Sequence, residues 1–259
     1  MKVIDLYKRL CEIIPTSLSC AWDRDGLESC PEPEREVKKV LVALDVTNEV
    51  IDRAIETGAD VIVSHHPLFF GGLGNINALT FDGGRAVKLA REGIAVMSFH
   101  TRLDALEGGV NDALAELIGL KDVRVIGDEG IARIGELEDE TDVRAFATAL
   151  RDKLSVGENE GEAHIAICPA SGRVKRVALL GGSGGDDIKV AAANGADTYV
   201  TGELKYHERL SAQDFGVNLI CAGHFFTEYP VCDFLKRTLE EICPDATVTK
   251  YFSNKIIEF

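Results

Sequence analysis

The chain has 259 residues, of which 46% are apolar and 27% are charged, a composition typical of globular proteins rather than disordered ones. At roughly 150 residues per domain, this length corresponds to one or two domains. The 28 Lys and Arg against 43 Asp and Glu give a formal net charge of −15. Such a charge argues against nucleic acids and anionic membrane surfaces as partners, because both attract basic proteins.

The sequence predicts a cytoplasmic protein without a membrane span. No apolar run approaches the ~18 residues that a membrane helix requires. The first ten residues alternate charged and apolar side chains, whereas a secretory signal has a continuous apolar stretch. The seven cysteines are an odd number and include no CxxC pair, which indicates reduced thiols rather than a disulfide framework or a thiolate zinc site.

The first half of the chain alternates strand and helix patterns. Apolar runs predict strands at residues 40–44, 61–64 and 94–99. Amphipathic patterns predict helices at 49–57 and 85–92, which end at Gly58 and Gly93. Continuous apolar strands separated by amphipathic helices are typical of a parallel sheet that is covered on both faces. We therefore predict an α/β fold.

The second half repeats this pattern after an acidic stretch at 127–142, which we interpret either as a domain junction or as a solvated hairpin. Further elements follow: a helix at 143–154, strands at 164–168, 174–180 and 198–201, and a helix at 186–194. The segments GADVIVSHH (58–66) and GADTYVTGE (195–203) share a helix, GAD and strand order. This repetition predicts two similar α/β halves.

Two adjacent histidines, His65 and His66, follow directly on a predicted strand and precede Pro67. In open α/β sheets, ligands bind outside the carboxyl ends of the strands. The pair is therefore well placed for a ligand, although two exposed loop histidines are an equal alternative.

Two further segments pair a histidine with a carboxylate four residues later. His100 and Asp104 lie just past a strand, where Asp104 is either a ligand or the N-cap of a following helix. His224 and Glu228 are spaced to share one face of a helix, so they can bind one ion.

These segments contain four of the six histidines of the chain. Imidazole and carboxylate ligands without thiolate suit zinc, iron or manganese. The groups exceed one tetrahedral shell, so the sequence predicts two ions ~3.5–4 Å apart, with Asp104 and Glu228 as the candidate bridges.

Seven ordered blocks resemble the Nif-three-like dinuclear metal-centre proteins, also named GTP cyclohydrolase I type 2 homologues. The blocks are residues 21–27, 44–47, 58–70, 100–120, 177–188, 195–207 and 222–228. The resemblance implies two α/β domains, with residues 1–123 plus 222–259 forming the metal-binding domain and residues 124–221 the second. It also implies a toroidal homohexamer built as a trimer of dimers. At 259 residues the chain resembles the short form, without the inserted domain of longer members.

By motif, the resemblance assigns the metal ligands as His65, His66, Asp104, His224 and Glu228. His100 matches another histidine of the motif, which is either a ligand or a proton carrier. The expected cofactors are two divalent ions per subunit, with iron or zinc first and manganese next. The implied reaction is attack of a metal-bound hydroxide on C8 of the guanine of GTP, with release of formate, in which His100 or His207 carries the proton.

Other residues and reactions stay open. Lys205 and Arg209 are either phosphate contacts or part of a solvated helix face, residues 181–185 form either an anion site or a tight turn, and Trp22 lies either at the mouth of the crevice or in the core. The same ions would also suit another two-metal hydrolase, such as a phosphoesterase, or a metal-handling protein without enzymatic activity.

Overall fold

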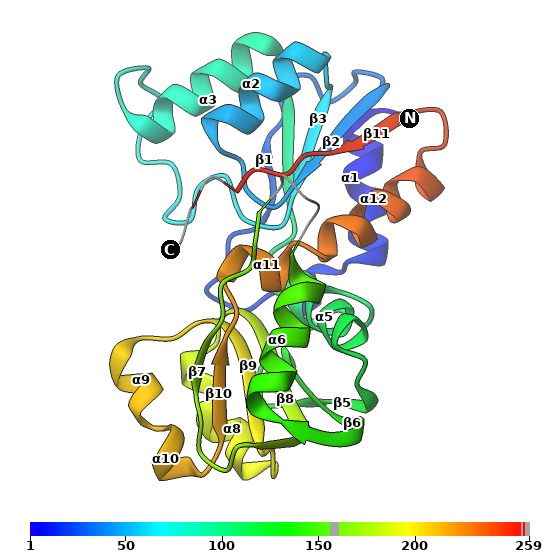
Figure 1. Ribbon diagram of the computed structural model, residues 1–259. Coiled ribbons are helices and arrows are strands. Elements are labelled where there is room, and N and C mark those ends of the chain that lie inside the picture. Colours follow the sequence, from blue (N-terminus) through cyan, green and yellow to red (C-terminus); the bar gives the residue numbers. More distant parts are fainter. Residues whose placement is uncertain (156–160, 255, 257–259) are drawn as a thin grey trace. The chain divides into compact units, whose positions relative to one another are not determined.

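The computed structural model describes residues 1–155, 161–254 and 256 and divides the chain into two compact units (Figure 1). Unit 1 comprises Met1–Leu103 and Val231–Ser253, and unit 2 comprises Asp104–Pro230 and Asn254–Phe259. This division differs from the predicted one, because residues 104–123, 222–230 and 254–259 fall in unit 2. The reason is packing: helices α5 (Val110–Ile118) and α11 (His224–Glu228) both contact strand β8 (Arg173–Ser183) of the second sheet.

Unit 1 contains a five-stranded sheet in the order β1-β4-β3-β2-β11. The strands are β1 (Gly26–Ser29), β2 (Lys39–Ala43), β3 (Val61–Ser64), β4 (Ala95–Ser98) and β11 (Thr247–Lys250). All neighbours are parallel except β1 and β4. The three strands predicted in the first half and their parallel arrangement are confirmed, and β11 shows that the C-terminal segment returns to the first sheet.

Helices cover both faces of this sheet. Figure 1 shows α2 (Asn48–Thr57) and α3 (Phe81–Glu92) on one face and α1 (Val3–Ile13) and α12 (Val231–Ile242) on the other. A short helical segment, η1 (Thr16–Leu18), also belongs to unit 1, and the chain passes from unit 1 to unit 2 within the short helix α4 (Thr101–Ala105).

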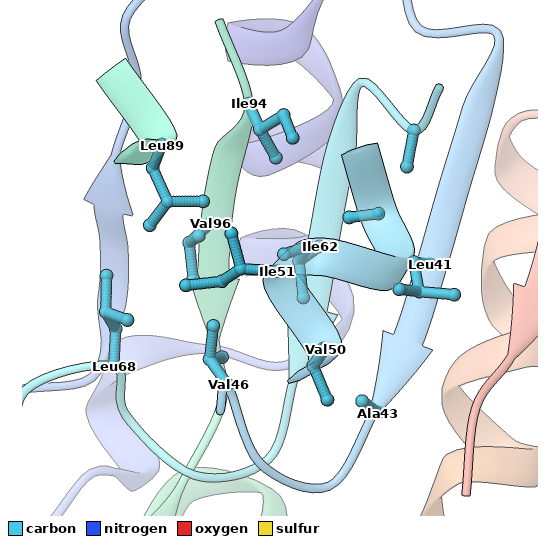
Figure 2. Close-up of a cluster of buried hydrophobic side chains, with 12 residues drawn as sticks. Leu41, Ala43, Val46, Val50, Ile51, Ile62, Leu68, Leu89, Ile94 and Val96 are labelled. Carbon is cyan, nitrogen blue, oxygen red and sulfur yellow. The ribbon is translucent and has the colours of Figure 1, made fainter. Parts of the chain in front are cut away.

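The core beneath α2 and α3 is aliphatic. Figure 2 shows Ile62 and Val96 of the sheet pointing toward Ile51 and Leu89 of these helices. Burial of each such side chain contributes about 1.5–3 kcal/mol. Both helices end, as predicted, at a glycine in the left-handed conformation, which directs the chain into the next strand.

Unit 2 contains a six-stranded sheet in the order β5-β6-β8-β9-β10-β7, of which β8, β9 and β10 are parallel. The other strands are β5 (Lys121–Ile126), β6 (Ala132–Asp142), β7 (Ala166–Cys168), β9 (Thr198–Glu203) and β10 (Asn218–Cys221). β5 and β6 pair as an antiparallel hairpin inside this sheet. The acidic stretch at 127–142 is therefore a hairpin and not a domain junction.

The helices of unit 2 also lie on both faces of their sheet. α5, α6 (Val143–Leu154) and α11 pack against β8 on one face. On the other face lie α8 (Ile188–Ala193), which follows η2 (Gly185–Asp187), and α10 (Ala212–Phe215). A further short helix, α9 (Tyr206–Leu210), follows β9. In the described part of the chain, no helix combines the length and apolar character needed to cross a bilayer.

The two GAD segments have the same structural role in their units. Asp60 accepts hydrogen bonds from the backbone N–H groups of Lys38 and Lys39, at the start of the neighbouring strand. Asp197 does the same for Lys175 and Arg176. Each aspartate thus fixes the register of two parallel strands, which confirms that the two halves are similar α/β folds.

Candidate metal centre

Three histidines of unit 1 lie together at the carboxyl ends of β3 and β4. His65 and His66 follow β3 directly, and His100 lies two residues after β4. One ring nitrogen of each lies within 4.8 Å of one nitrogen of both others. His65 and His66 are buried, so the alternative of two exposed loop histidines is wrong. The aligned register of β3 and β4, in which Ser64 pairs with Ser98, explains the proximity.

The Nδ1 atoms of His65 and His66 both face oxygen acceptors. His65 Nδ1 lies 3.0 Å from the carbonyl oxygen of Phe99, and His66 Nδ1 lies 2.7 Å from Oδ1 of Asp45. Carbonyl and carboxylate oxygens accept from an N–H, so this geometry assigns the proton of each ring to Nδ1 and the lone pair to Nε2. This arrangement is the usual one behind histidine ligands of metal ions.

His100 is held in the same way by the loop before β1. Its Nδ1 lies 3.0 Å from Oδ2 of Asp23, which also accepts hydrogen bonds from the backbone and hydroxyl of Thr101. Burial of Asp23 opposes ionisation, but the hydrogen bonds from His100 and Thr101 outweigh it and hold the pKa of this carboxyl below its usual range. Asp25 accepts from the backbone N–H of His100 and pairs with the buried Arg102. Both aspartates therefore fix the position of His100.

Trp22 lies in the same loop and is 64% exposed, with its ring edge-on to His100 at 6.1 Å between centroids. Of the two interpretations of Trp22, the core position is therefore wrong.

Unit 2 carries a histidine and a carboxylate on α11. His224 Nε2 lies 3.1 Å from Oε2 of Glu228, which confirms that their spacing places them on one helix face. Glu228 is buried. On its other side, His224 Nδ1 lies 3.3 Å from the carboxylate of Glu203, at the end of β9.

Glycines make room for this pair. A Cβ on Gly182 would lie 2.1 Å from Oε1 of Glu228, and a Cβ on Gly202 would lie 2.7 Å from the Cα of His224. The hydroxyl of Thr227 accepts from the N–H of Gly182 and holds α11 against the strand end. The backbone of β8 and β9 thus forms a cradle that any side chain at these two positions would fill.

Residues 181–183 of the predicted run are the closely packed end of strand β8, and residues 184 and 185 lead directly into η2. The anion-site interpretation finds no support, because two aspartates, Asp186 and Asp187, follow the run directly. Burial raises the pKa of Asp187, and the neighbouring charges of Glu129 and Asp186 add to this shift. An electronegative environment of this kind disfavours a second anion.

Asp104 is the fourth residue of α4 and is buried. It lies inside a helix, and α5 begins after Gly109, so the N-cap interpretation is wrong. The buried amide of Asn111 donates to the carbonyl of Asp104 and accepts from the N–H of Gly181. Asn111 thereby connects the backbone of Asp104 to the strand end that packs against Glu228.

His207 lies exposed on α9, whereas Lys205 and Arg209 line a cavity of unit 2.

Several supporting residues had no role assigned from sequence: Asp23, Asp45, Asn111, Gly202, Glu203 and Thr227. All six lie inside the seven ordered blocks that carry the family resemblance, and this position was the only sign in the sequence that they matter.

The types of donor present suit a divalent ion. The described ligand groups are imidazole nitrogens and carboxylate oxygens, the set that zinc, iron and manganese share. Hydrogen-bonded Nδ1 atoms and a cradle shaped around Glu228 are the kind of support that orients ligands. The residues present therefore fit a metal-binding function.

Comparisons with known proteins agree with this fold and donor set. The family model Duf34/NIF3 (NGG1p interacting factor 3) matches residues 1–257. A "GTP cyclohydrolase 1 type 2 homolog" of Clostridium perfringens is 33% identical over 93% of this chain and 92% of its own length, and "Protein NIF3 homolog" of Schizosaccharomyces pombe is 33% identical over 86% and 83%. A hypothetical protein of Staphylococcus aureus has a similar structure, with a TM-score of 0.89 and 29% identity over 100% of this chain and 99% of that one. The chain therefore belongs to the NIF3 family.

Proposed function

We propose that this protein binds two divalent metal ions per chain and is a metal-dependent hydrolase of a guanine nucleotide. The proposed ligands are His65 and His66 in unit 1 and Asp104, His224 and Glu228 in unit 2. The observation that carries the proposal is the set of acceptors behind Nδ1 of His65 and His66, which leaves Nε2 as the coordinating atom. Iron or zinc is the expected ion, with manganese next, because imidazole and carboxylate accommodate all three.

The proposed reaction is that of a GTP cyclohydrolase, in which water adds to C8 of guanine and formate is released. Relatives at about one-third identity carry the name "GTP cyclohydrolase 1 type 2 homolog", which supports this choice of substrate. When bound, the ions would lower the pKa of water towards ~7 and so supply hydroxide at neutral pH.

The residue proposed to move the proton is His100. Its Nδ1 is held by Asp23, so Nε2 is the atom that accepts and returns a proton. Ring contacts at 5.3 Å to His65 and 5.8 Å to His66 place it beside the proposed ligands of unit 1. His207 lies exposed on α9, with no comparable support among the described residues, so His100 is preferred.

The seven cysteines are free thiols, which supports the proposal that the protein works in the reducing cytoplasm.

The test measures formate release from GTP by protein reconstituted separately with iron, zinc and manganese, beside a chelated control. We expect metal-dependent formate over multiple turnovers. Release of inorganic phosphate is measured in the same samples. Phosphate without formate would replace the cyclohydrolase by a phosphoesterase, and neither product from a fully loaded protein would favour metal handling without catalysis.

A paired substitution tests the ligand assignment separately from turnover. Asp45→Asn removes the carboxylate behind His66 and is expected to lower metal affinity about 10- to 100-fold. Asp52→Asn is the matched control, since Asp52 is an exposed carboxylate of the same unit that pairs with Lys88 on the helix surface. Equal metal content of the two variants across a chelator titration would contradict the assignment of His66.

A further inference from the structure

A cavity of about 710 Å³ lies within unit 2, at the carboxyl ends of its parallel strands. Its lining includes the last residues of β8, β9 and β10: Ser183, Glu203 and Cys221. Small-molecule sites commonly have volumes of about 300–1,000 Å³, and in α/β sheets they lie at this end of the strands. His224 also lines the cavity, so it borders a proposed metal ligand.

Arg209 brings an unbalanced positive charge to this cavity. Its Nε donates to the carbonyl of Leu204 at 3.0 Å, and its Nη2 contacts Sγ of Cys221 at 3.6 Å. Neither acceptor is a carboxylate, and across residues 1–155, 161–254 and 256 no ion pair of Arg209 is present. The guanidinium is thus half-buried and held in place by neutral groups, with further N–H donors that these contacts do not use.

Lys205 adds a second cation to the lining. Its side chain is 74% exposed and its ammonium lies 3.4 Å from the carboxylate of Glu208, so it reaches both this partner and the cavity. Two acidic residues also line the cavity. Of these, Glu203 is directed to His224 Nδ1, and Glu162 is exposed. The half-buried charge at the strand ends is therefore that of Arg209.

We propose that this cavity binds the phosphate of a phosphorylated small molecule, with Arg209 and Lys205 as the phosphate contacts. The planar guanidinium donates paired hydrogen bonds that match phosphate oxygens, and the ammonium supplies a mobile point charge. The remainder of the molecule extends toward His224. If the protein is the proposed hydrolase, this site binds the phosphate of its substrate, and in that respect the inference rests on the proposed function. Binding of phosphate at this site does not itself require a metal ion.

The test is calorimetric titration of metal-stripped protein with pyrophosphate, with citrate and guanosine as comparison probes. Because no metal is present, failure of the proposed function does not affect the measurement. We expect pyrophosphate to bind more tightly than citrate, and guanosine to bind more weakly than both. Arg209→Gln is expected to weaken pyrophosphate at least about tenfold.

Two further variants, a second test and a control, show whether the phosphate contacts are those proposed. Lys205→Gln alters a side chain that is 74% exposed and is expected to weaken pyrophosphate binding several-fold. Arg173→Gln is the matched control, because Arg173 is an exposed cation of the same unit that does not line the cavity. Equal affinity in Arg209→Gln and Arg173→Gln would overturn the proposal, as would equal binding of citrate and pyrophosphate. Pyrophosphate binding that appears only in metal-loaded protein would place the phosphate on the metal instead.

Discussion

Gly182 is the glycine that leaves room for the carboxylate of Glu228. Gly182 has a φ of 69°, and a Cβ there would lie 2.1 Å from Oε1 of Glu228. Gly216 has a similar φ of 65°, but a Cβ at that position meets nothing within 4 Å. The two glycines therefore share the same backbone strain on substitution and differ in what the new atom displaces.

We expect the Gly182→Ala variant to lose most of its bound metal, because the new methyl group displaces the carboxylate of Glu228 from the position where it would bind the ion. Gly216→Ala is expected to keep its metal, although both variants lose about 1–2 kcal/mol of stability from the left-handed conformation. Metal content by elemental analysis and stability by urea unfolding separate the two effects. Equal metal content in both variants would show that the position of Glu228 is not needed for metal binding.

At this scale the sequence predicted which neighbouring side chains lie together on one helix, but it did not predict the residues that hold them in place. His224 and Glu228 are four residues apart, and local helical geometry is enough to bring them together. Asp23 and His100 are 77 residues apart in the chain, and only the tertiary fold brings them into contact. A short sequence pattern cannot predict a contact between residues so far apart in the chain.

At the scale of elements, patterns of apolar residues predicted the parallel strands β2, β3, β4, β8 and β9, but they missed the parallel strands β10 and β11. The edges were harder to predict, because strand β5 is almost wholly exposed and has no buried stripe to mark it. The same ambiguity left the acidic stretch open between a hairpin and a junction. Pairing of β6 with β5 makes the stretch part of a hairpin, and pairing of β6 with β8, between residues 31 to 46 positions apart in the chain, places it inside the sheet.

Strand β9 carries a buried tyrosine whose ionisation opposes folding. Tyr199 is fully buried, and its hydroxyl donates to the carbonyl of Gly184 at 2.8 Å. Burial raises the pKa of Tyr199 well above its ordinary value, and the charge of Asp187 adds to this shift. Above the ordinary tyrosine pKa of about 10, the unfolded chain loses this proton while the folded chain keeps it, so stability falls as pH rises.

We expect Tyr199→Phe to weaken the decline in the free energy of unfolding above about pH 10, at a cost of about 1 kcal/mol near neutral pH for the lost hydrogen bond. Urea unfolding between pH 8 and about pH 11 measures both effects. The exposed Tyr206→Phe is the control and should follow the unsubstituted protein. A decline in Tyr199→Phe as steep as in the control would mean that other groups cause the alkaline loss of stability.

At the scale of the whole molecule, an apolar segment of unit 1 remains exposed in the single chain. Large apolar side chains in residues 70–81 are 65–94% exposed: Phe70, Ile76, Leu79 and Phe81. Exposed apolar residues that gather in one segment are typical of a protein interface. A second copy of this chain is the occupant that the expected homohexamer requires.

We therefore expect light scattering to give a mass about six times the 28.1 kDa of the chain. Leu79→Lys should lower this mass and leave the fold unchanged, because Leu79 is 94% exposed and a lysine there costs nothing until it is buried against a partner. Circular dichroism checks that the variant is folded. A single-chain mass for the unsubstituted protein would contradict the hexamer, whereas an unchanged hexamer in Leu79→Lys would place the subunit contacts on another surface.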